Sequence, residues 1–325
     1  MFTITLSKIA SPILLSFSAA LLLTSSLTVK AHSAELLEPN QQAATSTQDI
    51  RLISAGAGIT ELVLALGGEN NLIAVDASSK IPKNLRHIKQ VGYHRMLSAE
   101  GLLSLHPNVL LGSDVMGPAN TLALLRSADV KVISLPSATN KNELFNNIDA
   151  VSTLLAKTNN AETLKNHLSA QLNKIAKNRN QISDSHPIKV LFMLLQAGRP
   201  AKVGGADTAA DIIIQLTGSQ NSATFSGYKT VSQEGILSMQ PDIILISSRN
   251  ESTEKQDISL FPLLANMPLL ASLPAYQNKH VFVIPPKALI GGLGLSAIDE
   301  AEILSQQFIS LTKSALPENS QEPVE

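Results

Sequence analysis

Residues 92–111 read GYHRMLSAEGLLSLHPNVLL, and residues 227–245 read GYKTVSQEGILSMQPDIIL. With one residue omitted after the tyrosine, the two stretches coincide at many positions and differ elsewhere mostly by conservative exchanges. A chain that repeats a pattern of this length contains the same structural unit twice. The identical pairs are Gly92/Gly227, Tyr93/Tyr228, Ser98/Ser232, Glu100/Glu234, Gly101/Gly235, Leu103/Leu237, Ser104/Ser238, Pro107/Pro241 and Leu111/Leu245.

A second match precedes each of these blocks in the same order. Residues 61–71 read ELVLALGGENN, and residues 211–221 read DIIIQLTGSQN. Short apolar strands such as RLIS, NLIAVD, NVLLGS, VKVISLP, IKVLFMLL and HVFVIP alternate with helical patterns, which is typical of mostly parallel sheets covered by helices. The sequence therefore predicts an α/β fold of two pseudo-duplicated, Rossmann-like lobes with mostly parallel sheets.

The segment between the repeats contains neither Gly nor Pro from residue 137 to residue 186. Its apolar residues recur at helical spacing, first at Leu144, Ile148 and Val151. We interpret residues 139–185 as a long bridging helix that joins an N-terminal lobe, residues 50–138, to a C-terminal lobe, residues 186–314.

The two ends of the chain have no repeat and no lobe pattern. Residues 1–34 place one lysine before a short apolar stretch and small residues, as in a signal peptide cleaved near residues 31–34. Residues 35–49 are expected to be a flexible lead-in and residues 315–325 a disordered tail. The chain has no cysteine, hence no disulfide and no acceptor for a lipid anchor. These features predict a free, monomeric, periplasmic protein.

The composition argues against several functions. A net charge of -1 over 325 residues does not favour nucleic acid or anionic lipid as a partner. The sequence has no G-x-S-x-G elbow, H-E-x-x-H motif or P-loop, and G-A-G at residues 56–58 lacks the third glycine of a dinucleotide fingerprint. We therefore expect a binding protein with no catalytic cofactor, although an enzyme with an α/β cleft stays an alternative.

Each repeated block has its own physical logic. Ser98 and Ser232 are natural N-caps, and Glu100 and Glu234 follow in the first helical turn, where negative charge is favoured. Helix-end electrostatics alone would account for both acids. The alternative is that a pseudo-symmetric pair of carboxylates docks onto a partner with two-fold symmetry and basic pockets.

The order of these motifs resembles the periplasmic haem-binding proteins of bacterial haem ABC importers. The resemblance rests on GITELVLALGG (58–68), VD (75–76) and VGYHRMLSAEGLLSLHPNVLL (91–111) in the first half, and GGADTAADIIIQLTGSQNS (204–222) with GYKTVSQEGILSMQPDIILI (227–246) in the second. It covers the chain from about Arg51 to Phe308. The Glu…Pro block is shared with vitamin B12 and siderophore receptors, whereas the G-Y-x-R-x-L-S-A-E-G run narrows the resemblance to haem.

The resemblance implies that Tyr93 is the axial ligand of ferric haem iron, carried as cargo. Phenolate is one of the axial ligands that proteins use for haem iron. In an extended segment Arg95 would point the same way as Tyr93 and hydrogen-bond the phenolate, and His94 would point to the opposite side, as a surface or supporting histidine. Without the resemblance, Tyr93 would be interpreted as a half-buried loop aromatic.

Further residues are candidates for the cleft between the lobes. Tyr228, the repeat partner of Tyr93, could line the opposite wall, and Lys80 and Arg199 could meet the haem propionates, with solvated surface charge as the alternative for both. The expected function is capture of haem and its delivery to an ABC permease through Glu100 and Glu234. Cobalamin, a ferric siderophore, another porphyrin or a transition metal remain alternative ligands, the last through histidines that lack ligand-type spacing, namely His87, His94, His106 and His280.

Overall fold

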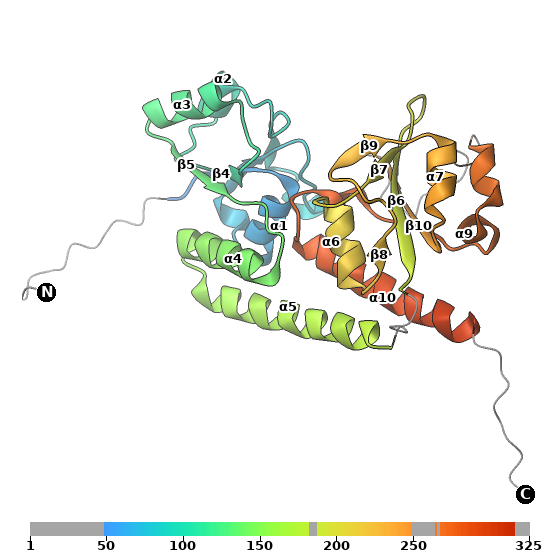
Figure 1. The fold of residues 1–325 in the computed structure, drawn as a ribbon. Helices are drawn as coiled ribbons and strands as arrows, with labels where there is room; N and C mark the ends of the chain where they lie inside the picture. The colour runs from blue at the N-terminus through green and yellow to red at the C-terminus, as the bar shows by residue number, and fades with distance from the viewer. Residues whose placement is uncertain (1–48, 182–186, 249–263, 265–266, 316–325) are drawn as a thin grey trace, which may run out of the picture. The chain divides into compact units, whose positions relative to one another are not determined.

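The computed structural model describes residues 49–181, 187–248, 264 and 267–315 (Figure 1). The predicted signal peptide, all but the last residue of the lead-in, and the tail after residue 315 lie outside this part of the chain. Among the described residues, no helix combines the length and the apolar character needed to cross a bilayer.

The N-terminal lobe contains a sheet of five parallel strands in the order β3-β2-β1-β4-β5. The central strands β1 and β4 are buried along their whole length, because helices cover both faces of the sheet. The strands span Leu52–Ala55 (β1), Leu72–Val75 (β2), Lys89–Gln90 (β3), Val109–Ser113 (β4) and Lys131–Leu135 (β5).

Helix α1 packs on one face of this sheet, and α2 and α3 pack on the other. Leu62 of α1 belongs to one apolar cluster, whereas Leu102 of α2 and Leu125 of α3 belong to a separate one. The helices span Ala57–Ala65 (α1), Ala99–Leu103 (α2) and Ala119–Ser127 (α3), with the 3-10 turns η1 at Glu69–Asn71 and η2 at Lys83–Leu85.

The C-terminal lobe contains a mixed sheet in the order β11-β10-β6-β7-β9, with β8 also paired to β6. Its β6, β8, β10 and β11 ladders are parallel, and β7 is antiparallel to both of its neighbours. The strands span Lys189–Leu195 (β6), Lys202–Gly204 (β7), Gln220–Asn221 (β8), Tyr228–Thr230 (β9), Ile243–Ser248 (β10) and Val281–Val283 (β11).

Helices also cover both faces of the second sheet. Helices α6 and α10 pack on one face, and α7, α9 and the 3-10 turn η4 pack on the other. The elements span Ala209–Leu216 (α6), Gln233–Met239 (α7), Pro268–Ser272 (η4), Pro274–Gln277 (α9), Pro286–Leu289 (η5) and Leu295–Ala315 (α10). The α/β fold of two covered sheets, predicted from the sequence, is confirmed.

The connection between the lobes is a pair of helices and not one unbroken helix. Helix α4 spans Lys141–Leu155, and α5 spans Thr158–Arg179. Ala156 adopts a left-handed conformation (φ 54°, ψ 44°), and Lys157 N–H donates to the Ser152 carbonyl at 2.8 Å. This is the hydrogen bond of a helix C-terminal Schellman motif, which reverses the chain without a glycine.

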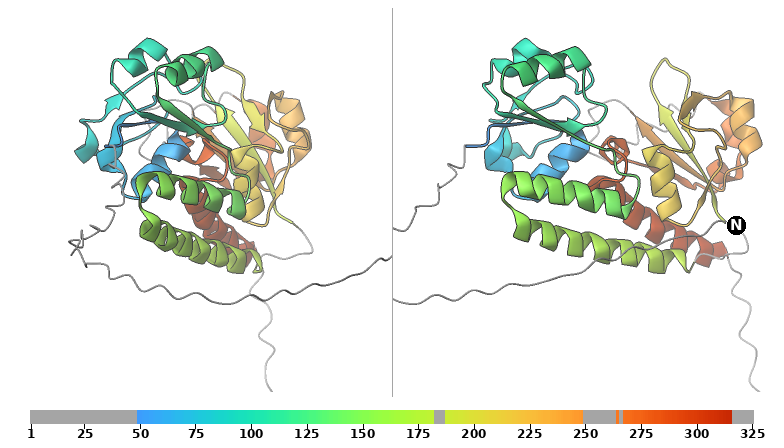
Figure 2. Two further views of the ribbon diagram at one scale, coloured as in Figure 1. Left: turned by 90° about the vertical axis from the view of Figure 1, so that its left-hand side faces the viewer. Right: turned by 60° about the vertical axis from the view of Figure 1, so that its left-hand side comes forward.

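The reversal places α5 against both α4 and α10, as Figure 2 shows. Buried Leu168 and Ile175 of α5 belong to the same apolar cluster as Ile148 of α4. Polar contacts join α5 to α10 on the outer side, including Lys174 Nζ to Glu302 Oε1 at 2.6 Å. The helical connection therefore forms part of the common core.

The sequence repeat is also a structural repeat. Helix α2 leads into β4, and α7 leads into β10, each through a proline. Ser98 Oγ accepts the Gly101 N–H at 3.3 Å, and Ser232 Oγ accepts the Gly235 N–H at 3.2 Å. Both N-caps that the sequence predicts are confirmed.

Candidate functional site

Tyr93 lies on the loop between β3 and α2 in the N-terminal lobe. Its side chain is 47% exposed, although the surrounding loop is held firmly by hydrogen bonds. Met96 N–H donates to the Tyr93 carbonyl at 2.7 Å, so residues 93–96 form a tight turn. We predicted an extended conformation for this segment and derived the orientations of Arg95 and His94 from it. That prediction is wrong, because the segment is a turn.

His94 is a buried residue, with only 4% of its surface exposed. Its ring centroid lies 4.2 Å from that of Tyr93, with the planes tilted by 52°. Of the two interpretations of His94, a surface or a supporting histidine, the surface one is wrong, because its side chain turns inward to the buried carboxylate of Asp76. The supporting role stays a prediction.

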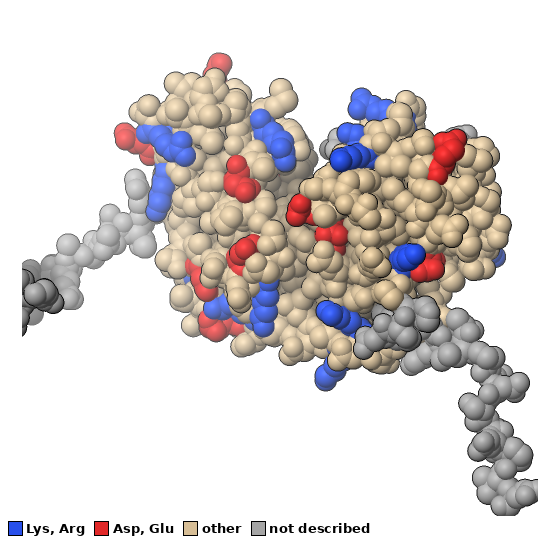
Figure 3. Space-filling view, in the orientation of Figure 1, with Lys and Arg blue, Asp and Glu red and all other residues tan. Residues whose placement is uncertain are grey.

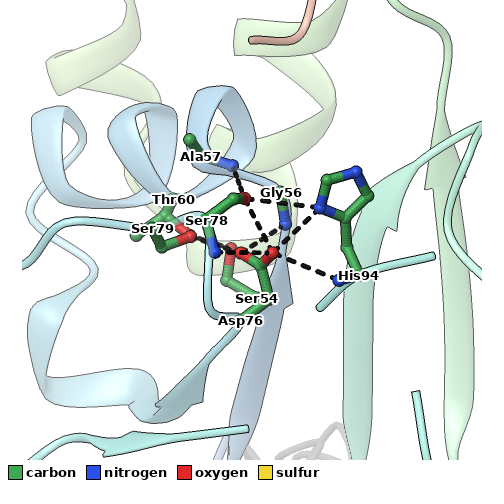
Figure 4. A network of polar contacts seen from close by, with 8 residues as sticks. All are labelled: Ser54, Gly56, Ala57, Thr60, Asp76, Ser78, Ser79 and His94. Atoms are coloured by element: carbon green, nitrogen blue, oxygen red, sulfur yellow. Dashed lines mark hydrogen bonds and ion pairs between the residues drawn. The ribbon is translucent and has the colours of Figure 1, made fainter. Parts of the chain in front are cut away.

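Asp76 directly follows β2 and is fully buried at the carboxyl end of the parallel sheet (Figure 4). Its Oδ2 accepts hydrogen bonds from His94 Nδ1 at 2.9 Å and from the His94 backbone N–H at 3.3 Å. The same oxygen accepts from Ser78 Oγ at 2.7 Å and from the Ser78 N–H at 3.1 Å. Oδ1 accepts from the Gly56 N–H at 2.9 Å and from Ser79 Oγ at 2.6 Å.

Two further hydroxyl groups complete this buried network. Thr60 Oγ1 lies 2.7 Å from Ser79 Oγ and 2.7 Å from Ser54 Oγ. The network thereby links β1, α1, the loop after β2 and the Tyr93 loop. A buried polar network whose members are all paired makes a unique local structure rigid.

The charge state of Asp76 follows from these contacts. Burial acts to raise its pKa, but hydrogen bonds from His94, Ser79, Ser78 and the Gly56 N–H together hold the pKa of Asp76 well below its usual range. An ionised carboxylate only accepts hydrogen bonds, so His94 Nδ1 carries a proton. The other ring nitrogen of His94 points away from Asp76 (Figure 4).

Both neighbours of Tyr93 are therefore held in place. The Gly92 carbonyl accepts the Ala77 N–H at 3.3 Å, and the His94 carbonyl accepts the Gly117 N–H at 2.8 Å. Gly117 in turn accepts the Leu97 N–H at 2.8 Å. These bonds fix a tyrosine that is itself open to solvent, which suits a residue that receives a ligand.

Exposed apolar side chains gather around this loop. Met96 belongs to the same turn as Tyr93, and Val115 belongs to the loop after β4, which is hydrogen-bonded to the turn through Gly117. Single exposed apolar residues are common, but here Tyr93, Met96 and Val115 lie on two joined loops at the carboxyl end of a parallel sheet, where α/β proteins bind ligands.

The predicted residues of the cleft lie at the surfaces of their own lobes. Lys80 and Arg95 are exposed in the N-terminal lobe, and Arg199 is exposed in the turn between β6 and β7. None of these three described side chains hydrogen-bonds Tyr93. Tyr228 begins β9 and packs edge-on against Phe192, with ring centroids 6.2 Å apart.

The two repeated acids are exposed in the first turns of α2 and α7. Neither Glu100 nor Glu234 forms an ion pair within the described part of the chain. The Glu234 carboxylate accepts hydrogen bonds from the Glu234 backbone N–H and from the Ser232 side chain, and both lower its pKa. This carboxylate is therefore charged at neutral pH. On the face seen in Figure 3, acidic and basic side chains are interspersed over both lobes, so a charged partner would be recognised by local groups.

His87, His94, His106 and His280 do not assemble into a metal site in the described part of the chain. Among residues 49–181, 187–248, 264 and 267–315, no group of three or more His, Asp or Glu side chains could hold a metal ion. His94 instead pairs with Asp76, and His280 Nδ1 lies 3.3 Å from the Asp242 carbonyl.

Sequence reasoning missed Asp76, Ser78 and Ser79. Their signal is the polar run DASS directly after an apolar strand, at the edge where a parallel sheet presents its loops. The pairing of Asp76 with His94 has no local signal, because these residues lie 18 positions apart.

The chain has two α/β lobes whose sheets are covered by helices, a helical connection between them, and an exposed acid in the first turn of an N-capped helix in each lobe. These are features of a substrate-binding protein of the ABC importer type. The chain belongs to the periplasmic binding protein family, because the model of this family matches residues 52–288. Proteins of this family and the structural neighbours are substrate-binding transport proteins and not enzymes.

Solved structures and curated relatives agree with this class. The chain is similar to the periplasmic heme binding protein HutB of Vibrio cholerae, at 40% identity and TM-score 0.70, over 80% of this chain and 99% of that one. It is also similar to a periplasmic heme binding protein from Pseudomonas aeruginosa, at 33% identity and TM-score 0.73, over 80% and 92% of the two chains. The vitamin B12-binding protein of Vibrio cholerae serotype O1 is 25% identical over 199 residues, which are 61% of this chain and 70% of that protein.

Proposed function

We propose that this protein binds haem in the periplasm and delivers it to the permease of an ABC importer, with Tyr93 as the ligand of the haem iron. The observation that carries the proposal is the half-exposed Tyr93 on a rigid loop, beside the exposed apolar residues Met96 and Val115. The two haem-binding proteins named above, to which this chain is 40% and 33% identical, support the choice of ligand.

The chemistry of ferric haem suits this loop. The iron is a hard Lewis acid, for which a phenolate is one of the axial ligands that proteins supply. A free tyrosine has a pKa of about 10, so the iron itself and nearby positive charge must favour the phenolate. Arg95, two residues after Tyr93, is an exposed source of such charge, and the porphyrin would rest on the apolar side chains of Met96 and Val115.

The remaining parts of the proposed site come from other loops. Lys80 follows the Asp76 network directly and offers a cation for a haem propionate, and Arg199 offers another from the C-terminal lobe. Tyr228 would contribute an aromatic wall, and His94 would support Tyr93 through its ring contact. The lobes comprise residues 50–138 and 186–314 in this proposal, joined by residues 139–185.

Delivery would use the repeated acids. Glu100 and Glu234 are exposed, lack an ion-pair partner among the described residues and occupy equivalent helical turns. We propose that each meets a basic side chain of the permease. The protein would reach the periplasm through a signal peptide cleaved near residues 31–34, without a lipid anchor because the chain contains no cysteine.

A titration of the mature protein with hemin, followed by absorbance, tests the ligand and the site together. We expect a saturable ferric spectrum of the phenolate-ligated type for the wild type and its loss in Tyr93→Phe. Tyr276→Phe, the same chemical change on α9, is the control and should bind as the wild type does.

Each other result has a distinct meaning. Normal binding by Tyr93→Phe would overturn the assignment of the ligand but keep haem. A wild type that binds hemin only nonspecifically, as an apolar surface does, but binds cyanocobalamin saturably would favour the second candidate function, a vitamin B12 receptor. The similarity to the vitamin B12-binding protein of Vibrio cholerae supports this candidate.

A further inference from the structure

Exposed large apolar side chains occur at few places in the described structure. Tyr93, Met96, Val115 and Tyr228 belong to the proposed haem site, and Ile303 lies alone on α10. Two leucines remain, Leu124 on α3 and Leu269 on η4. Each of them lies beside one of the two repeated acids.

In the N-terminal lobe, Glu100 and Leu124 line the same hollow between α2 and α3. The hollow has a volume of about 700 Å³, and Leu103 and Ala128 contribute to its apolar lining. Leu125 points into the core and is fully buried, so the adjacent Leu124 is turned outward and is 56% exposed. Glu100 is the only charged side chain that lines this described hollow.

In the C-terminal lobe, Glu234 and Leu269 line a second hollow, of about 740 Å³, between the start of α7, η4 and the β6–β7 turn. Leu269 is 38% exposed, and its N–H donates to Gln233 Oε1 at 3.2 Å, which ties η4 to the first turn of α7. Arg199 also lines this hollow. The hollow beside Glu100 is therefore the simpler of the two to test.

The two leucines are not part of the sequence repeat, because the aligned blocks end at Leu111 and Leu245. They nevertheless complete the same arrangement twice, namely a hollow, an exposed leucine and a carboxylate without an ion-pair partner among the described residues. A surface that is presented twice fits a partner with two equivalent subunits, each offering the same complementary groups. The partner that this family requires is an ABC permease.

We propose that Leu124 and Leu269 are apolar anchors of the permease-docking surface, each packing against an apolar side chain of one permease subunit while the adjacent acid meets a basic one. Exposed ion pairs contribute little net affinity but give orientation and speed of association. Binding energy in protein interfaces comes mainly from a few anchors that fill hollows. The inference rests on the proposed docking through Glu100 and Glu234.

The test uses Leu124→Ser, Leu269→Ser and the double variant, with Ile303→Ser as the matched control. Each gene replaces the chromosomal copy in the source bacterium, and uptake of hemin is measured with hemin as the sole iron source. We expect hemin affinity in vitro within about twofold of the wild type for every variant. We expect roughly tenfold lower uptake for the double variant, which loses both interface anchors. Ile303→Ser should take up hemin normally.

Uptake equal to the wild type in the double variant would overturn the inference while leaving haem binding intact. If instead the wild type does not bind hemin, the proposed function fails, and a second measurement decides the inference independently. Leu124→benzoylphenylalanine and Ile303→benzoylphenylalanine are crosslinked by light in cells. A crosslink to the transmembrane subunit of an ABC importer, identified by mass spectrometry, from position 124 but not from position 303 supports the docking surface, and its absence from position 124 refutes it.

Discussion

Replacing the buried carboxylate of Asp76 should be among the most destabilising single changes in the N-terminal lobe. Asp76→Ala removes the acceptor of hydrogen bonds from Gly56, Ser78, Ser79 and His94. The hydroxyl groups can rotate toward other acceptors, but the backbone N–H groups of Gly56, Ser78 and His94 cannot. A buried donor left unpaired costs about 1–3 kcal/mol, and three backbone donors lose their acceptor together. We therefore expect the free energy of unfolding to fall by about 4 kcal/mol.

Urea unfolding followed by far-ultraviolet circular dichroism measures this loss, because the protein has no tryptophan. Asp114→Ala is the matched control. Asp114 follows β4 of the same parallel sheet, as Asp76 follows β2, but it is exposed and accepts one side-chain hydrogen bond, from Ser137 Oγ at 2.9 Å. The control should lose less than about 1 kcal/mol. An Asp76→Ala protein within 1 kcal/mol of the wild type would refute the reasoning that the network organises this lobe.

The pH dependence gives a second check on the same residue. Because the pKa of Asp76 is lower in the folded protein than in the unfolded chain, its charge stabilises the fold above the unfolded pKa of about 3.9. This contribution is lost as the pH falls below that value, toward the folded pKa. The difference in unfolding free energy between wild type and Asp76→Ala should thus be constant near neutral pH and shrink on acidification below pH 4. A difference that stays constant to pH 3 would contradict the assigned charge.

Three further predictions concern other parts of the fold. Burial raises the pKa of Glu300 to about 7, so the wild type loses stability as the pH rises from 4.5 to 7. In urea unfolding, Glu300→Gln should be more stable than the wild type by on the order of 2–3 kcal/mol at pH 8 and similar to it at pH 4. An equal difference at both pH values would contradict this. Ser98→Ala and Ser232→Ala each remove an N-cap and should lower the unfolding free energy by about 1 kcal/mol, whereas the corresponding Ser→Thr variants, which keep the capping oxygen, should not. Gly292 has a φ of 76°, and a Cβ there would collide with a backbone carbonyl, so Gly292→Ala should lower the melting temperature markedly, while Gly294→Ala, with open space around it, should leave it within a few degrees.

Local patterns predicted the architecture because they act over short distances. The repeated blocks place a capping serine, an acid and a proline at fixed spacing, and each such block became a capped helix followed by a buried strand. The alternation of apolar strands with helical segments likewise predicted two sheets covered on both faces. Each of these signals depends only on residues that are neighbours in the sequence.

The break between α4 and α5 shows where such signals end. No glycine or proline marks it, and the weak helix formers Thr158, Asn159 and Asn160 that follow the break belong to α5 itself. The chain reverses at Ala156 because the reversal lets Leu168 and Ile175 of α5 join the core that Ile148 of α4 already occupies. Burial of an apolar face outweighs the cost of one left-handed alanine, and only the packed lobes reveal that gain.

The residues of the candidate site show the same contrast between local sequence signals and tertiary structure. The sequence by itself determined that Tyr93 follows Gly92 in a repeated loop, with Glu100 and Glu234 at equivalent helix starts. Only the tertiary structure decided that His94 turns inward, because its partner Asp76 reaches it across the edge of the parallel sheet. A buried carboxylate must collect its donors from wherever the fold brings them, and the residues that hold Tyr93 in place are therefore distant in sequence and adjacent only in space.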